Sequence, residues 1–194
     1  MFTGIIQTIA EVTHSSTIAG SLNLEIAIPE GWELTLGQSI AVNGACLTIT
    51  KLDTKTFTVN LMPETQKKTT FGKNVPEQVN LELAMAASGR FEGHIVQGHV
   101  DTVGTVSSIK QQASSQEMTI TFPSKYKSPV VDKGSIAIDG VSLTVIRASS
   151  DSLSVGLIPY TLKHTTLGDL RRGDSVNLEF DIIGKYIAKQ KGGL

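Results

Sequence analysis

Hydrophobic and polar residues alternate along several short stretches of the chain, a pattern typical of β-strands with one buried face. The stretches 22–28, 56–61 and 152–157 alternate in this way, and 118–122 matches 24–28 in position and character. Glycine and proline residues lie between these stretches. Many short strands at close spacing, separated by such residues, predict an all-β barrel or sandwich.

Two dipeptides mark tight turns inside longer apolar stretches. Asn43-Gly44 interrupts 39–49, and Asp139-Gly140 interrupts 135–145. Both dipeptides favour a two-residue hairpin because their backbones adopt positive φ at low cost. Each stretch is therefore predicted to form a β-hairpin.

Short helices are predicted after two prolines. Proline suits the first position of a helix, and Pro63 and Pro159 directly precede the runs 64–69 and 160–165. Each run is long enough for one or two turns. The first backbone N–H groups of such a helix have no partner within it, so they can bind the polar edge of a ligand.

The chain also repeats its own sequence. The matched stretches are 39–49 with 135–145, 61–65 with 157–161, 79–83 with 176–180 and, more loosely, 3–6 with 97–100. Such a repeat predicts two folded copies of one unit. We expect an N-terminal barrel over 1–87, a C-terminal barrel over 88–181 and an oligomerisation helix over 182–194. Two similar pockets would suit a reaction between two copies of one molecule.

The segment after the second copy resembles neither copy. Ile182, Ile183, Tyr186 and Ile187 fall on one face of a predicted helix. Because so short a helix is marginal alone, its apolar stripe should pack either against this chain or against another copy of it.

Charge and cysteine content narrow the class of protein. The 194 residues carry a net charge of -1 and contain no basic block, which disfavours a nucleic-acid-binding protein. A single cysteine excludes an internal disulfide and suits a reducing compartment. The chain begins without the features of a signal peptide, and no apolar stretch is long enough to span a membrane. These features predict a cytoplasmic protein.

Several common kinds of site are disfavoured. His94 and His99 are five residues apart, which places them on opposite faces of a strand, and no cluster of other ligands completes a metal site. The glycine-rich signatures of dinucleotide-binding and nucleotide-binding loops are missing. Ser142 lacks the G-x-S-x-G context of a hydrolase nucleophile.

Differences between the two copies indicate where the chemistry lies. His99 aligns with Ile5, and histidine is the natural proton acceptor near neutral pH. Cys46 aligns with Ser142, and both can act as nucleophiles, although a lone cysteine is more often a small core residue. Lys133 aligns with a glycine, and the simpler explanation is a solvated turn lysine.

Two threonines are the same in both copies. Thr48 and Thr144 carry hydroxyls that can donate to and accept from a heterocycle with carbonyl and ring-nitrogen edges. The alternative explanation is that β-branched residues simply fill strands. Their place in a long repeated block leaves the two explanations about even.

Five motifs in order resemble the riboflavin synthase family of the alpha type, which has two lumazine-binding repeats. The motifs are MFTGII at 1–6, NGACLT at 43–48, GHIVQGHVD at 93–101, IDGVSLT at 138–144 and LIPYTL at 157–162. The resemblance covers essentially the whole chain. It implies two similar six-stranded antiparallel Greek-key barrels, a C-terminal helix and a homotrimer assembled through those helices.

The resemblance also implies a reaction. Two molecules of 6,7-dimethyl-8-ribityllumazine dismutate, because one transfers a four-carbon unit to the other, giving riboflavin and 5-amino-6-(ribitylamino)uracil. The enzyme would be a transferase that needs no metal or organic cofactor. Lumazine synthase is a further candidate partner.

The family motifs imply two substrate pockets. The first would involve Gly4, Ile5, Ile6, Cys46, Leu47, Thr48, Asn60, Leu61, Met62, Pro63, Glu64 and Thr65, and the second Gly98, His99, Val100, Lys133, Ser142, Leu143, Thr144, Leu157, Ile158, Pro159, Tyr160, Thr161 and Leu162. His99 is the candidate base, with Ser142 or Cys46 as nucleophile or proton relay. Phe2 and Asp181 also match positions that the family associates with catalysis.

Two other functions compete with this enzyme. A non-catalytic lumazine or flavin carrier, such as an antenna protein, would be degraded at the second pocket and at Phe2 or Cys46, whereas these residues are present. An oligonucleotide-binding barrel is disfavoured because aromatic residues make up only 5% of the chain and no basic stripe exists.

Overall fold

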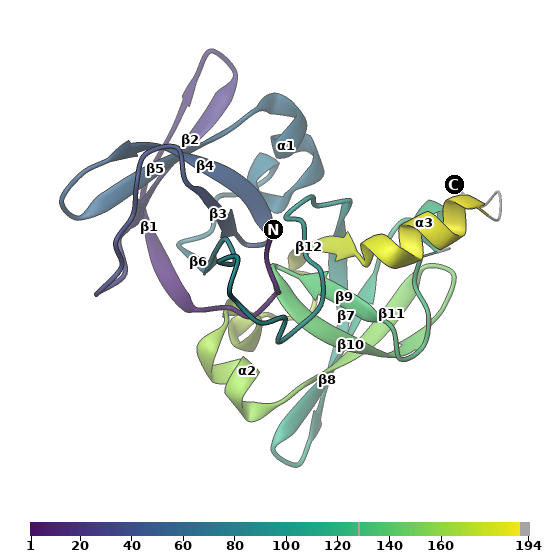
Figure 1. The fold of residues 1–194 in the computed structure, drawn as a ribbon. Helices are drawn as coiled ribbons and strands as arrows, with labels where there is room; N and C mark the ends of the chain where they lie inside the picture. Colours follow the sequence, from purple (N-terminus) through teal and green to yellow (C-terminus); the bar gives the residue numbers. More distant parts are fainter. Residues whose placement is uncertain (128, 191–194) are drawn as a thin grey trace.

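Two closed six-stranded antiparallel barrels lie side by side and are followed by a short C-terminal helix, so the predicted fold is confirmed (Figure 1). The computed structural model describes residues 1–127 and 129–190. The first residues of the chain lie between the two barrels (Figure 1).

Both barrels have the same strand connectivity. The first contains β1 (Thr8–Ile18), β2 (Ser21–Ala27), β3 (Ser39–Val42), β4 (Ala45–Leu52), β5 (Thr56–Leu61) and β6 (Gln78–Leu83). The second contains β7 (Thr102–Gln112), β8 (Ser115–Thr121), β9 (Ser135–Ile138), β10 (Val141–Ala148), β11 (Ser152–Leu157) and β12 (Ser175–Phe180). In the first barrel β3, β4 and β5 pair in sequence and β6 returns to pair with β3, which is a Greek key, and the second barrel repeats it.

The predicted hairpins and short helices are present in both copies. Asn43 and Gly44 have φ of 44° and 77°, and Asp139 and Gly140 have 45° and 82°, as a tight primed turn requires. Helices α1 (Pro63–Lys68) and α2 (Pro159–His164) begin at their prolines. Three 3₁₀ turns complete the described elements: η1 (Thr70–Gly72), η2 (Ser124–Tyr126) and η3 (Thr166–Asp169).

Each barrel has its own hydrophobic core. Along β2 the side chains of Leu22, Leu24 and Ile26 point inward while their neighbours are less buried, as the alternation predicts. A third, smaller cluster lies between the barrels and consists of Phe2, Ala41, Val96 and Ala137. The barrels are therefore packed against each other through apolar contacts as well as joined by the chain.

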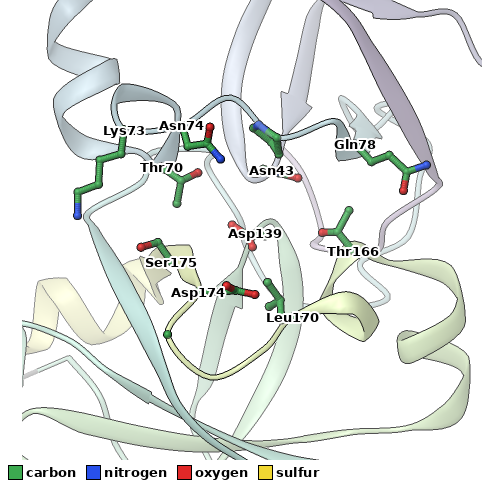
Figure 2. Close-up of a pocket in the computed structure, with 12 residues that line it drawn as sticks. Asn43, Thr70, Lys73, Asn74, Gln78, Asp139, Thr166, Leu170, Asp174 and Ser175 are labelled. Atoms are coloured by element: carbon green, nitrogen blue, oxygen red, sulfur yellow. The ribbon is translucent and has the colours of Figure 1, made fainter.

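Matched asparagines also connect the barrels. Asn80 on β6 donates through Nδ2 to the Asp139 carbonyl at 2.9 Å, and Asn177 on β12 donates to the Asn43 carbonyl at 2.9 Å. A cleft of about 400 Å³ follows this seam, with Asp139 and Asn43 among its lining residues (Figure 2). The residues predicted to bind substrate do not line it.

The predicted C-terminal helix is α3 (Ile182–Gln190). It packs near Pro129 through Gly184, but Ile183, Tyr186 and Ile187 are 56%, 67% and 50% exposed. This chain alone therefore does not cover the predicted apolar stripe. Residues 191–194 of the predicted segment lie outside the described residues. Among the helices described, none has the length and apolar character needed to cross a membrane.

Candidate functional site

Two short segments, 2–6 and 96–100, run between the barrels and carry many of the predicted site residues. Phe2 and Val96 pair as an antiparallel bridge, with N–H to carbonyl distances of 2.8 and 3.1 Å. The loose sequence match between 3–6 and 97–100 therefore corresponds to two segments in equivalent places.

Each segment docks on the barrel of the other copy. The Gly98 carbonyl accepts from the Cys46 N–H in the first barrel at 2.8 Å, whereas the Gly4 carbonyl accepts from the Ser142 N–H in the second barrel at 2.7 Å. The predicted pockets placed each segment with the barrel of its own copy, whereas the structure packs each segment on the barrel of the other copy. Gly4–Ile6 pack on the second barrel at Ser142, and Gly98–Val100 pack on the first barrel at Cys46. This is because each segment crosses the seam before the first strand of its own barrel begins.

Glycine is required where the segments cross. Gly4 and Gly98 have φ of 77° and 79°, in the left-handed region. A Cβ atom at Gly98 would lie 2.5 Å from the Cβ of Cys46, and one at Gly4 would lie 2.6 Å from the Cβ of Ser142. The backbone of each segment therefore lies directly against the residue that the sequence marked as nucleophile-capable.

A buried glutamate holds each segment from the opposite side. Glu82 on β6 accepts from the N–H groups of Thr3 and Gly4 at 2.7 and 3.0 Å. Glu179 on β12 accepts from the N–H groups of residues 97 and 98 at 2.7 and 2.9 Å. Burial raises the pKa of both carboxyls, and these hydrogen bonds act against that rise.

The first barrel presents a small outer cavity of about 250 Å³. Its lining residues come from β4, α1 and the crossing segment and are Ala45, Cys46, Glu64, Thr65, Lys68, Thr69, Gly98, His99 and Val100. Six of these were predicted to bind substrate. His99 is exposed, and the Cys46 thiol is free and partly exposed.

The equivalent face of the second barrel brings Ser142 together with a histidine. His94 Nδ1 lies 2.7 Å from Ser142 Oγ, and the His94 N–H donates to the Thr3 carbonyl at 3.1 Å. Burial lowers the pKa of His94, and the charge of Asp181 acts against that change. The imidazole is therefore favoured in its neutral form, which can accept the Ser142 proton.

Three predicted contact residues point away from any ligand. The side chains of Leu47, Leu61 and Leu157 lie in the barrel cores, so these residues can offer a ligand only backbone groups. Phe2 is fully buried between the barrels, so its ring holds the crossing segments together and does not line the cavity of the first barrel.

The remaining predicted residues differ in their exposure to solvent. Those that are exposed are Ile5, Thr48, Met62, Pro63, Glu64, Lys133, Thr144, Ile158, Pro159 and Tyr160, and those that are partly exposed include Ile6, Asn60, Thr65, Leu143, Thr161 and Leu162. Lys133 has φ of 63°, so its backbone is held in the left-handed region. Asp181 caps α3, because its Oδ1 accepts from the Ile183 N–H at 2.9 Å.

Sequence reasoning missed the residues that position the segments. His94 was considered only as a metal ligand, and Glu82 and Glu179 were noted only as part of a repeat. A signal for the glutamates was present, because a repeated charged residue inside an apolar strand needs a buried partner.

Comparisons with known proteins find the same two-copy organisation of the chain. A family model described as a lumazine binding domain matches residues 3–84 and again residues 97–181. The riboflavin synthase of Actinobacillus pleuropneumoniae is 43% identical over 192 residues, covering 96% of this chain and 88% of that protein. The riboflavin synthase of Mycobacterium tuberculosis is 40% identical over 195 residues, covering 97% of both chains.

Solved structures with the same fold carry related ligands. The structure of LumP complexed with riboflavin matches with a TM-score of 0.84 and 25% identity, covering 93% of this chain and 99% of that chain. LumP complexed with 6,7-dimethyl-8-(1'-D-ribityl) lumazine matches with a TM-score of 0.80 and 25% identity, covering 92% and 98%. With two matched domains and relatives of this identity along nearly its full length, the chain belongs to the riboflavin synthase family of lumazine-binding-domain proteins.

Proposed function

We propose that this protein is a riboflavin synthase that converts two molecules of 6,7-dimethyl-8-ribityllumazine into riboflavin and 5-amino-6-(ribitylamino)uracil. The observation that carries the proposal is the pair of equivalent places, at Cys46 and at Ser142, where a crossing segment packs on a strand of the other copy's barrel, the first of them lining a cavity together with helix α1. The relatives at 36–43% identity, all named riboflavin synthase, support it.

The residues of the two faces suit the steps of this reaction. A proton must leave the 7-methyl group of one lumazine, and the exposed His99 is the base that we assign to it. The resulting carbanion attacks a ring carbon of the other lumazine, and a second C–C bond then closes the new ring. The two C–N bonds that hold the four-carbon unit to its donor break, and the donor nitrogens take up the released protons as 5-amino-6-(ribitylamino)uracil leaves. Holding two rings face to face can contribute about 7–11 kcal/mol to lowering the barrier.

Ser142 and Cys46 are the candidate nucleophiles or proton relays at the second ring. The Ser142 hydroxyl can pass its proton to the neutral His94, 2.7 Å away, as it adds to a ring carbon or relays a proton. The Cys46 thiol lies in the cavity with His99 and can act there in the same way. No step requires a metal or an organic cofactor.

A homotrimer would complete the site. The cavity at His99 is about 250 Å³, which is below the usual range for a ligand pocket and too small for two stacked lumazines. A neighbouring chain could cover it with its second barrel, and the exposed stripe of Ile183, Tyr186 and Ile187 offers an apolar surface for assembly. Lumazine synthase as a partner and a cytoplasmic location stay predictions, the latter supported by the lone unpaired cysteine.

The experiment must distinguish an enzyme from a carrier, because LumP, which has the same fold, has been solved in complex with riboflavin and with the dimethyl-ribityllumazine. Purified protein is incubated with the dimethyl-ribityllumazine while flavin fluorescence is recorded. We expect one flavin to form for every two lumazines consumed. Binding of one lumazine per chain without conversion would instead identify a carrier.

A further inference from the structure

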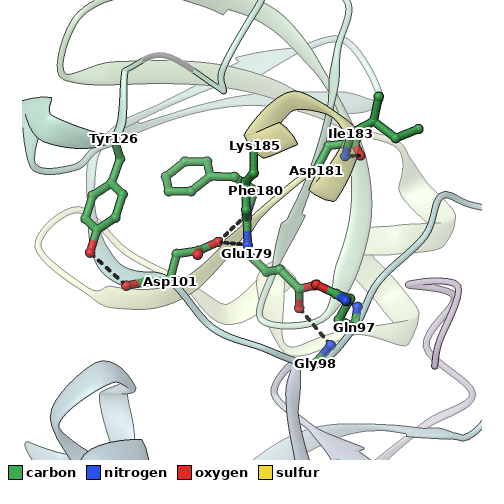
Figure 3. A network of polar contacts seen from close by, with 9 residues as sticks. All are labelled: Gln97, Gly98, Asp101, Tyr126, Glu179, Phe180, Asp181, Ile183 and Lys185. Carbon is green, nitrogen blue, oxygen red and sulfur yellow. Dashed lines mark hydrogen bonds and ion pairs between the residues drawn. The ribbon is translucent and has the colours of Figure 1, made fainter. Parts of the chain in front are cut away.

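The segment that carries His99 is anchored at both of its ends. At one end Glu179 holds residues 97 and 98, and at the other Asp101 is bound by the second barrel and by Lys185 of α3 (Figure 3). We propose that Glu179 and Lys185 are positioning residues for His99, so that helix α3 controls the N-terminal pocket of its own chain. This inference rests on the proposed function, in which His99 is the base.

The anchor at Asp101 is an ionic contact that is partly buried. Asp101 Oδ2 accepts from the Phe180 N–H at 2.9 Å and lies 2.6 Å from Lys185 Nζ. The Asp101 carbonyl also accepts from the Tyr126 hydroxyl at 3.1 Å. A charged donor and two neutral donors therefore fix this residue, and hydrogen bonds to ionised groups are the stronger kind.

Only two residues lie between the anchors. The Glu179 bonds end at Gly98, and the Asp101 contacts begin two residues after His99. With both flanks held, the backbone at His99 has little freedom, although the imidazole itself is exposed. This is the arrangement expected for a catalytic side chain that must meet a substrate at a fixed distance.

The other copy has the same anchors without the ion pair. Glu82 replaces Glu179, and Gln7 Oε1 accepts from the Leu83 N–H at 2.9 Å as Asp101 accepts from Phe180. Ile5 occupies the position of His99. Residues 84–101, which follow β6, contain no helix, so this copy has no counterpart of Lys185. Among the described residues, the ionic anchor thus occurs only in the copy that carries the candidate base.

Helix α3 is linked to the segment that carries His99 through Lys185. Lys185 lies on the same short helix as the exposed Ile183, Tyr186 and Ile187, and the helix begins directly after β12. Any partner that binds the exposed stripe would therefore also fix the lysine that holds Asp101. Assembly and activity are coupled within a single chain by this contact.

The test uses the intact protein and three substitutions. Lys185→Met removes the charge that binds Asp101. Glu179→Gln replaces one acceptor oxygen by an NH₂ donor that faces a backbone N–H group. Lys189→Met is the matched control, because Lys189 lies on the same helix and is exposed. We expect Lys185→Met and Glu179→Gln to lower kcat by about 10- to 100-fold, in line with the cost of misplacing a catalytic group. Lys185→Arg should restore most of the loss, and Lys189→Met should have little effect.

Two further readouts separate positioning from a structural role. Amide hydrogen exchange of a peptide covering 97–101 should become about tenfold faster in Lys185→Met and Glu179→Gln. In a His99→Gln background the same substitutions should lower kcat by no more than about twofold, because the group that they position is already lost. Light scattering on each variant reports its molar mass, which distinguishes a displaced segment in an intact assembly from a dissociated assembly.

The outcomes that overturn the inference are distinct from failure of the proposed function. Unchanged exchange at 97–101, or losses of kcat that multiply with His99→Gln, would show that the anchors do not act through His99. A wild-type protein that forms no flavin would refute the proposed function, while the exchange experiment would still report whether Lys185 and Glu179 hold the segment. If Lys185→Met fails to fold, Asp101→Asn provides the same test by making this copy resemble the neutral one.

Discussion

The two crossing segments share their buried contacts and differ in their exposed chemistry. Glu82 and Glu179 hold the two segments through the same backbone groups, and Asn80 and Asn177 cross the seam in the same way. At the exposed positions, Ile5 in one segment corresponds to His99 in the other. A buried hydrogen-bonded group cannot be exchanged without leaving a partner unpaired, whereas an exposed one can.

This difference explains how a duplicated fold could support two unlike half-reactions. The shared buried groups keep both faces in the same geometry, and the exposed residues give each face its own proton chemistry. Cys46 with His99 on the first barrel, and Ser142 with His94 on the second, are two separate combinations on one scaffold. The comparison predicts that substitutions at exposed site residues change the rate directly, and that substitutions at the apolar and asparagine contacts between the barrels change stability. Glu179 is the exception, because it acts on the rate through the position of His99.

The largest expected effect is on the rate when His99 is replaced. His99→Gln keeps a polar side chain of similar size but removes the proton acceptor, so kcat should fall by about 10²- to 10⁴-fold. Lumazine conversion followed by flavin fluorescence measures this change. His14→Gln, on the exposed part of β1, is the control and should keep wild-type kcat. An unchanged rate in His99→Gln would remove His99 from the role of base.

The next largest effect is on stability, when the side chain of Phe2, which connects the two segments, is truncated. Phe2 is fully buried and pairs with Val96, its equivalent in the other copy. Phe2→Ala should lower the free energy of unfolding by about 3–5 kcal/mol, because it leaves a cavity between the barrels. Val96→Ala deletes fewer carbons and should cost less. Urea unfolding of both variants tests this order. Equal losses of unfolding free energy would show that the surrounding residues move in to fill the cavity left at Phe2.

Most of the fold follows from local sequence patterns. The alternation in 22–28 gave the inward side chains of β2, and Asn43-Gly44 with Asp139-Gly140 gave two of the hairpins. The barrels could be predicted because turn residues and two-residue periodicity act over short distances. The repeat then extended each local prediction to its equivalent in the second copy.

The pairing of the segments with the barrels could not be predicted in this way. The family motifs grouped Gly4 with Cys46, but the structure joins Gly4 to Ser142 across 138 positions because the segments cross the seam. Such a contact depends on the packing of two barrels, which no local pattern encodes. For the same reason the hydrogen bond between His94 and Ser142 was missed.

The smallest expected effect concerns Asp139, which corresponds to Asn43 in the first copy. Both side chains accept from a backbone N–H, of Asn177 and of Asn80 respectively, but only Asp139 can ionise. Burial raises the pKa of Asp139 from 3.8 to about 7, although the hydrogen bond from Asn177 acts against the rise. The folded state therefore holds this proton more tightly than the unfolded state, and stability falls as the pH increases from about 4 to about 7.

Asp139→Asn makes the second copy resemble the first and removes this loss. The variant should be more stable than wild type by about 1–3 kcal/mol at pH 8, with a smaller difference at pH 5, because asparagine keeps the acceptor without the charge. Asparagine also tolerates the positive φ at this position, which adds a gain that does not depend on pH. The informative quantity is therefore the change in the difference between the two unfolding free energies from pH 5 to pH 8. Asn43→Asp should produce the opposite trend, and parallel pH profiles for wild type and Asp139→Asn would show that the cleft solvates the carboxylate well enough to keep it charged.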